Sequence, residues 1–255
     1  MANEISVTLN SHALSSTNNI AIEDINIQIA KAVRSFELPK SYGSVVPIAK
    51  RSSAIFRVKG TIIDSDYDAL RTGLDSLKSK LESSSEYQLT IDDDRYMNVQ
   101  YRNFAYSWKK LRTFAVFNFD LIASDPFWYA STATTANPQS WTTGVTFTVT
   151  NSGNAPTRLK ITITCGATPV SDDIRIENTT TSDLLQYRGS LTTGQVLVIN
   201  NRVDAADVAV TKDGVNDIVR FEGDFITLNP GANSIKLTSA ISNLTLRLDH
   251  RNAWY

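Results

Sequence analysis

The stretch Asp125-Pro126-Phe127-Trp128-Tyr129 closes an alternating run of apolar and polar residues, Thr113 to Ala123, and a polar stretch of small residues follows it. Alternation with period two predicts a strand with one buried face. Three aromatic residues between a strand and a featureless stretch indicate that one domain ends there and another begins. We therefore expect a first domain over residues 1–130, a linker over 131–140 and a second domain over 141–255.

The composition is that of a globular protein, with 42% hydrophobic and 20% charged residues among 255. Charge is balanced, with 15 basic and 15 acidic residues up to position 140 and 10 and 11 beyond it. Sequence-specific nucleic-acid binding is not expected, because the chain lacks a basic stripe that would neutralise phosphates. Membrane insertion is not expected either, because no run approaches the roughly 18 apolar residues that a spanning helix needs. The N-terminus does not resemble a signal peptide, which predicts synthesis in a cytoplasm.

One amphipathic helix is expected among the strands of the first half. Leucines recur at helical spacing from Leu70 to Leu81, which predicts a single apolar stripe. Ser65 is placed to cap the N-terminus of this helix, and acidic residues follow in the first turn. After the helix, residues 95–107 and 111–123 predict a long β-hairpin with its bend near Trp108.

The second half reads as strands throughout. Short alternating segments are separated by turn residues such as Lys212-Asp213-Gly214 and Asn229-Pro230-Gly231. Many short strands with regular turn signals are typical of a β-sandwich or jelly roll. We therefore predict a mainly β protein, with an N-terminal β-sandwich that carries one α-helix and a long hairpin, and a C-terminal galectin-like or jelly-roll sandwich.

Residues that would support catalysis or cofactor binding are sparse, and we expect neither an enzyme nor a cofactor. The two histidines, His12 and His250, do not suffice for a zinc site or a histidine-based triad without many further partners. Asp64 to Asp68 resembles the start of a calcium loop but lacks its glycine and its final glutamate, so helix capping is the better interpretation. A glycoside hydrolase with paired carboxylates stays open, because such residues need no fixed spacing.

The tryptophans and a small basic cluster are the candidates for contacts between subunits or domains. Trp128 and Trp141 flank the expected linker, and with Phe127 and Tyr129 they are candidates for a domain junction. The hairpin bend and the helix are candidates for subunit contacts, through the residues Leu70, Leu74, Trp108, Lys109, Lys110 and Arg112. Exposed aromatic residues on a jelly roll also suit sugar stacking, so a carbohydrate-binding module that contacts a host cell wall is the alternative.

Several short motifs, taken in order, resemble the distal tail (Dit) proteins of tailed bacteriophages. The first is Gly60-Thr61-Ile62, the leucine helix, and then Leu89-Thr90-Ile91-Asp92 with Arg95. The second runs from Phe119 through the aromatic stretch to Tyr129. The others are Asn151-Ser152-Gly153-Asn154-Ala155-Pro156; Tyr187-Arg188-Gly189-Ser190-Leu191 with Gly194; and Gly223-Asp224-Phe225 with Leu228, Pro230-Gly231, Asn233, Arg251 and Trp254-Tyr255. Each motif is short, but together they extend over nearly the whole chain.

The resemblance implies a structural role at the distal end of a virion tail. Proteins of this family form a hexameric ring through the N-terminal domain, which joins the tail tube protein to the tail-tip hub, also called the tail-associated protein. DNA passes through the central channel of the ring, and the C-terminal domain projects outward. Receptor-binding proteins and the tape measure protein are further partners that the resemblance suggests. The second domain is short, without room for an inserted carbohydrate-binding module.

Overall fold

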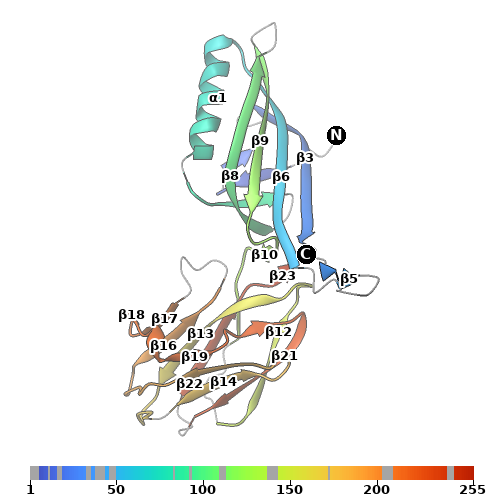
Figure 1. Ribbon diagram of the computed structural model, residues 1–255. Helices are drawn as coiled ribbons and strands as arrows, with labels where there is room; N and C mark the ends of the chain where they lie inside the picture. The colour runs from blue at the N-terminus through green and yellow to red at the C-terminus, as the bar shows by residue number, and fades with distance from the viewer. Residues whose placement is uncertain are drawn as a thin grey trace. The chain divides into compact units, whose positions relative to one another are not determined.

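The structure is a computed structural model in which the chain divides into two compact units, Met1–Trp128 and Tyr129–Tyr255 (Figure 1). The boundary lies inside the aromatic stretch that follows the long hairpin. Both units consist mainly of antiparallel strands, with one α-helix in the described part of the chain, so the predicted mainly β class is confirmed. The structure describes residues 6–10, 12–15, 19–32, 36–37, 44–45, 50–82, 84–91, 94–108, 113–136, 143–171, 173–202, 209–239 and 244–255.

The first unit is built on one sheet with the strand order β2-β1-β7-β8-β9-β6-β3. A separate short pair, β4 and β5, lies outside this sheet. The elements are β1 (Val7–Leu9), β2 (His12–Leu14), β3 (Ile20–Ala32), β4 (Phe36–Glu37), β5 (Ser44–Val45), β6 (Lys50–Ile63), α1 (Tyr67–Glu82), β7 (Tyr87–Ile91), β8 (Arg95–Trp108) and β9 (Phe114–Ala123).

Strand β8 takes part in two regions of this sheet. Its residues 97–99 pair with β7, and residues 100–108 pair with β9, with a register shift between Tyr101 and Asn103. The hairpin of β8 and β9 is therefore the long hairpin that the alternating sequence predicts. Beyond the register shift, β8 continues with β9, β6 and β3 as a sheet of four long antiparallel strands, which we call the long-strand sheet.

Helix α1 covers the apolar face of the long-strand sheet. Its four leucines, Leu70, Leu74, Leu77 and Leu81, are at most 3% exposed and join the same core as Phe56 and Phe117. Figure 1 shows α1 running alongside β8 and β9. The sequence pattern therefore located the helix and its buried stripe correctly.

The N-cap of α1 is Asp66 and not the expected Ser65. The backbone N–H of Ala69 donates to Asp66 Oδ1 at 2.9 Å, and Ser65 Oγ donates to Asp66 Oδ2 at 3.2 Å. A carboxylate accepts the free N–H groups of a first turn better than a neutral hydroxyl does, because it also interacts with the helix dipole. The hydrogen bond from Ala69 is the main reason why the pKa of Asp66 lies below its ordinary value.

The second unit consists of two antiparallel sheets around one core. One sheet has the order β11-β22-β13-β16-β17-β18 with β20 beside β13, and the other has the order β12-β21-β14-β15-β19. The elements are β10 (Trp128–Ala130), β11 (Thr134–Ala136), β12 (Thr146–Asn151), β13 (Thr157–Cys165), β14 (Ile174–Asn178), β15 (Asp183–Tyr187), β16 (Val196–Asn200), β17 (Ala209–Lys212), β18 (Val215–Asn216), the 3₁₀ turn η2 (Ile218–Arg220), β19 (Phe221–Gly223), β20 (Thr227–Leu228), β21 (Gly231–Thr238), β22 (Leu244–His250) and β23 (Ala253–Trp254).

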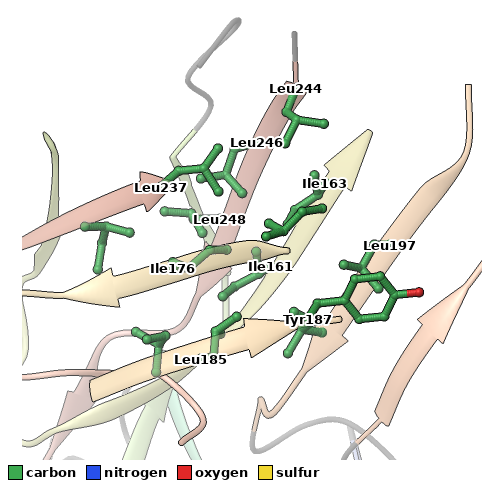
Figure 2. Close-up of a cluster of buried hydrophobic side chains, with 14 of the residues drawn as sticks. Ile161, Ile163, Ile176, Leu185, Tyr187, Leu197, Leu237, Leu244, Leu246 and Leu248 are labelled. Atoms are coloured by element: carbon green, nitrogen blue, oxygen red, sulfur yellow. The ribbon is translucent and has the colours of Figure 1, made fainter. Parts of the chain in front are cut away.

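The core of the second unit is filled from both of these sheets. Figure 2 shows Ile161 and Leu246 from the first sheet directed toward Ile176 and Leu237 from the second. Burial alternates along several of the longer strands, for example along β13, where the burial pattern changes at every residue. Two facing sheets with such alternation form a β-sandwich, as expected for this half.

The stretch expected to be a linker, residues 131–140, contributes a strand to the second unit. Thr134–Ala136 form β11, which pairs with β22, and Thr135 Oγ1 donates to Asp249 Oδ1 at 2.6 Å. Threonine is β-branched and suits a half-exposed edge strand, although the surrounding alanines and serines gave no strand signal. Residues 137–140 of the expected linker lie outside the described residues.

Candidate assembly interface

The long-strand sheet has one edge at β3 that carries exposed isoleucines. In the described part of the chain, β3 is the last strand of the sheet path and pairs with β6 alone. Ile27 is 45% exposed and Ile29 is 37% exposed, although both lie on the sheet face that is elsewhere buried. A long edge strand with apolar side chains offers backbone hydrogen-bonding groups and a hydrophobic strip to another chain.

The other edge is the hairpin end of β8, which carries an exposed aromatic cluster. Strand β7 pairs with β8 at residues 97–99 and does not reach this end. Tyr106 and Trp108 are 50% and 36% exposed, and Tyr67 at the start of α1 is 40% exposed. The ring of Trp108 lies 5.3 Å from that of Tyr67 and 5.6 Å from that of Tyr106. We call these three residues the aromatic edge cluster.

The exposed side chains at both edges lie on the same face of the sheet. Directly paired residues of neighbouring strands share a face. Ile27 pairs with Phe56 across β3 and β6, and that face continues to the buried core. Trp108 pairs with Ala115, which in turn pairs with Ile62 of β6 on the core face. The edges are therefore extensions of the core face that α1 does not cover.

The middle of the opposite face of the long-strand sheet is polar, and two of its cations are paired with carboxylates, whereas Ile63 on the same face is 59% exposed. Lys59 Nζ lies 3.1 Å from Glu23 Oε2, and Arg57 Nε lies 3.9 Å from Asp120 Oδ1. Thr61 Oγ1 also donates to Glu23. A shallow hollow on this face is lined mainly by charged and amide side chains: Asp24, Asn26, Arg57, Lys59, Asn103, Asn118 and Asp120. We call this surface the polar face.

Of the residues predicted for subunit contacts, the structure places Trp108 at an exposed edge but not the two leucines. Leu70 and Leu74 are 0% and 3% exposed, and their side chains pack in the core of their own chain. That expectation for the leucines is corrected, because a single apolar stripe on a helix is fully used in covering a sheet. Lys109, Lys110 and Arg112 lie outside the described residues.

Sequence reasoning did not single out the isoleucines of β3. The alternation of Ile25, Ile27 and Ile29 predicts a strand with one apolar face, but it does not reveal that no other element covers part of that face.

The aromatic stretch between the two units is divided between them. The ring of Trp128 packs edge-on against Phe56 in the first unit, with 5.9 Å between ring centroids. Tyr129 begins the second unit and is 3% exposed, and Phe127 is partly buried. Trp141 lies outside the described residues. The role of these four residues at a domain junction stays a prediction.

Chemistry-bearing groups are dispersed over the fold. Among the described residues, no group of three or more His, Cys, Asp or Glu side chains is arranged to hold a metal ion. His12 lies on the β1–β2 hairpin near Lys80, and His250 is buried in β22 with Nε2 at 3.1 Å from the carbonyl oxygen of Thr150. Cys165 is a buried free thiol at the end of β13.

Within the described residues, no helix combines the length and the apolar character needed to cross a membrane.

The motifs of the second unit close turns and fix the end of the chain. Asn151 Nδ2 donates to the carbonyl oxygen of Ala155, and Asn154 Oδ1 accepts from the backbone N–H of Tyr255. A Cβ atom on Gly153 would lie 1.8 Å from the carbonyl oxygen of Ala253, so glycine is required for this close approach.

A second motif of this unit buries a tyrosine. Tyr187 is fully buried and its hydroxyl donates to Asp217 Oδ2 at 2.5 Å. Burial, together with that hydrogen bond, raises the pKa of Tyr187. Gly189 packs against the Tyr187 ring, which leaves no room for a side chain.

Residues 152–254 match the family model described as the siphovirus-type tail component, C-terminal domain. The second half of this chain is a phage tail component domain. This assignment agrees with the observation that the motif residues of the second unit are held in one closed sandwich.

Solved structures extend the likeness to the first unit. The crystal structure of the Dit protein of phage SPP1, described as a paradigm of hub adsorption apparatus, is similar with a TM-score of 0.75 and 15% identity. The match covers 99% of this chain and 100% of that one. A chain of the phage P2 baseplate in its activated conformation with Ca matches with a TM-score of 0.55 and 9% identity, over 99% of this chain and 98% of that one. Among curated proteins, none matches this chain.

The family match and the shared fold confirm the resemblance to phage distal tail proteins. Residues 152–254 carry a tail component domain, and the whole chain shares the fold of the SPP1 Dit protein.

Proposed function

We propose that this tail component forms a hexameric ring that joins the tail tube to the tail-tip hub and lets DNA pass through its centre. The observation that carries the proposal is the pair of unlike exposed edges on the long-strand sheet. A ring needs two different complementary surfaces on each subunit, because its contacts are heterologous. The isoleucine edge and the aromatic edge cluster supply two such surfaces.

Strand direction favours pairing between these edges. The long-strand sheet has four antiparallel strands, so its two edge strands run in opposite directions. Copies related by rotation about an axis along the strands would therefore bring β3 of one copy antiparallel to β8 of the next. The alternation of strand directions would continue unbroken around the ring, and every backbone hydrogen-bonding group at the joint could be paired.

A stagger along the joint would bring the exposed side chains together. Ile27 is level with Phe56 of β6, whereas Trp108 is level with Ile62, six residues further along that strand. Shifting the neighbouring copy by this amount would set Ile27 opposite Trp108 and Ile29 opposite Tyr106. Six residues of shift per four strands corresponds to a strand tilt of about 45°, at the upper end of the range of closed barrels.

The further partners follow from the family that the chain resembles. The tail tube protein and the tail-tip hub would meet the two rims of the ring, and the tape measure protein would lie near the channel. Receptor-binding proteins would attach to the second unit. We infer a structural role and no enzymatic one.

The carbohydrate-binding alternative has less support. In the described part of the second unit, Tyr255 is the single aromatic residue more than one-third exposed, whereas sugar stacking uses flat exposed rings.

The test introduces charge at the isoleucine edge. The double variant Ile27→Lys and Ile29→Lys keeps the strand but places two ammonium groups where the next copy would pack, a device that blocks edge pairing in natural sheets. The matched control is Val215→Lys and Val219→Lys in the second unit, where the two valines are 70% and 88% exposed.

Light scattering coupled to size exclusion reads the result. Six chains of 28.2 kDa give about 169 kDa for the wild type and the control, whereas the edge variant is expected to elute as a folded monomer. A wild-type monomer at high concentration, or an edge variant that still forms rings, would contradict the proposal.

A further inference from the structure

The polar face of the long-strand sheet pairs its positive charges in a way that stability does not explain. Lys59 and Arg57 are more than half exposed, and each has a carboxylate from a neighbouring strand beside it. Exposed ion pairs of this kind contribute only about 0–1 kcal/mol to folding, since water and salt screen them. What the pairing does change is the electrostatic potential of the face, because each cation is accompanied by an anion.

The position of α1 decides which face would line a ring. If copies join edge to edge, as the proposed function requires, the long-strand sheets close into a barrel with one face inside. The apolar face carries α1 and its four buried leucines, so it has to lie on the outside, where there is room for a helix. The polar face then lines the channel.

We propose that the polar face is a self-neutralised channel lining, past which a DNA duplex moves without being held. This inference rests on the proposed ring. Arg57 and Lys59 would place twelve cations around six copies, enough to bind the phosphate backbone strongly if they were uncompensated. Glu23 and Asp120 cancel that attraction at the two positions where it would arise.

The experiment removes the two carboxylates without changing their shape. In the channel variant, Glu23→Gln and Asp120→Asn keep the hydrogen-bonding capacity of both side chains and remove the carboxylates paired with Lys59 and Arg57. Among the described residues that line the hollow, Asp24 is then the remaining carboxylate. The control variant makes the same change of charge on the opposite side of the sheet, on the exposed face of α1. There Arg71 and Lys78 pair with Asp75 and Glu82 at 3.9 Å and 4.0 Å, so the control is Asp75→Asn with Glu82→Gln.

Binding is measured with two fluorescent DNA duplexes by anisotropy, on samples whose mass has been determined by light scattering. One duplex has free ends and can thread a ring; the other carries streptavidin on both ends and cannot. We expect weak binding of both duplexes by the wild type. The channel variant should bind the free-ended duplex about tenfold tighter or more at about 50 mM salt, and lose that binding by about 200 mM salt, as phosphate contacts do. The blocked duplex should not gain.

Each other outcome counts against the inference. Tight binding by wild-type rings would show that the lining is not neutralised. An equal gain in the control variant would assign the effect to net charge, and an equal gain with the blocked duplex would place the polar face outside the channel. If the wild type forms rings but the binding results differ from those expected, only this inference is contradicted. A monomeric wild type overturns the proposed function and this inference with it.

Discussion

The two units differ in where their exposed apolar side chains lie, since each exposes six large ones among the described residues. In the second unit, two sheets face each other, and the end of the chain is tied down by Asn151, Gly153 and Asn154. In the first unit, one helix covers a sheet that extends past it on both sides, which leaves isoleucines at one edge and aromatic rings at the other. Among the described residues of the second unit, the exposed aliphatic side chains are Val215 in β18, Ile218 and Val219 in η2, and also Val145 and Leu184.

Under the proposed ring, this difference indicates which half of the molecule another copy would complete. In the second unit, two facing sheets bury one core within one chain. A sheet with two long uncovered edges is prone to pair with other chains unless the protein uses those edges. In the proposed ring, the first unit would carry the contacts between subunits, and the second unit would present its surface to other proteins.

The largest effect is expected from the aromatic edge cluster. Replacing Tyr106 and Trp108 with serine removes two exposed rings whose packing would anchor the joint between copies, and aromatic anchors dominate protein interfaces. We expect the ring to dissociate to monomers at micromolar concentration, as judged by sedimentation. Far-ultraviolet circular dichroism should be unchanged, since both side chains are exposed. Intact rings in this variant would show that the aromatic edge cluster does not hold neighbouring subunits together.

Two glycines should respond to alanine with opposite signs. In the second unit, Gly153→Ala forces a Cβ atom to within 1.8 Å of the carbonyl oxygen of Ala253, and overpacking of this kind costs about 1–3 kcal/mol. In the first unit, a Cβ atom on Gly73 meets only Ile62 Cγ2 at 3.5 Å, so Gly73→Ala should stabilise α1 by about 0.5–1 kcal/mol. Denaturant unfolding of the two variants measures both changes. Equal changes would show that the chain end in the second unit is loosely held.

The smallest effect is a dependence of the unfolding free energy on pH, which should arise from a histidine buried in the second unit. Burial lowers the pKa of His250, against the effect of its hydrogen bond to Thr150 and of the nearby Asp249 carboxylate. The unfolded chain takes up a proton below about pH 6.5, where folded His250 stays neutral, so stability should fall as the pH drops through that window and be fully present above it. The loss is at most about 1.4 kcal/mol per pH unit.

Unfolding at pH 7.5 and pH 5.5 provides the measurement for this dependence. The variant His250→Gln should lose most of the difference in unfolding free energy between the two pH values. The control His12→Gln removes a histidine from the first unit, whose pKa is lowered by desolvation and by Lys80, and should retain the part due to His250. An unchanged loss in His250→Gln would exclude this histidine as the cause.

Local patterns in the sequence predicted much of this fold. The leucine spacing from Leu70 to Leu81 located α1, and alternation located the β8–β9 hairpin and most strands of the second unit. The cap was assigned to Ser65, one residue too early, because serine and aspartate are both common N-cap residues and the exact start of a helix is not fixed by residue type. Strand β11 was missed because it is stabilised by long-range pairing with β22, which a local stretch of small polar residues does not predict.

The candidate interface was only partly predictable, because exposure is a property of tertiary structure. Trp108 was a candidate because of its position at a hairpin bend, and its role in a subunit contact stays a prediction. Leu70 and Leu74 were assigned to an interface because an apolar stripe looks the same whether it covers a sheet or a neighbouring subunit. Ile27 and Ile29 were read as ordinary strand residues, since the reach of α1 over β3 cannot be inferred from either segment separately.

Cross-linking between the two edges tests the central claim most directly. A variant with Ile29→Cys and Tyr106→Cys, joined by a short bifunctional maleimide, should give a ladder of covalent species up to six chains, and each single-cysteine variant should give none. The native Cys165 is 2% exposed and should not react. Covalent dimers from a single-cysteine variant would show like edges in contact, and rings that do not cross-link would show that other surfaces join the subunits; either result would contradict the account.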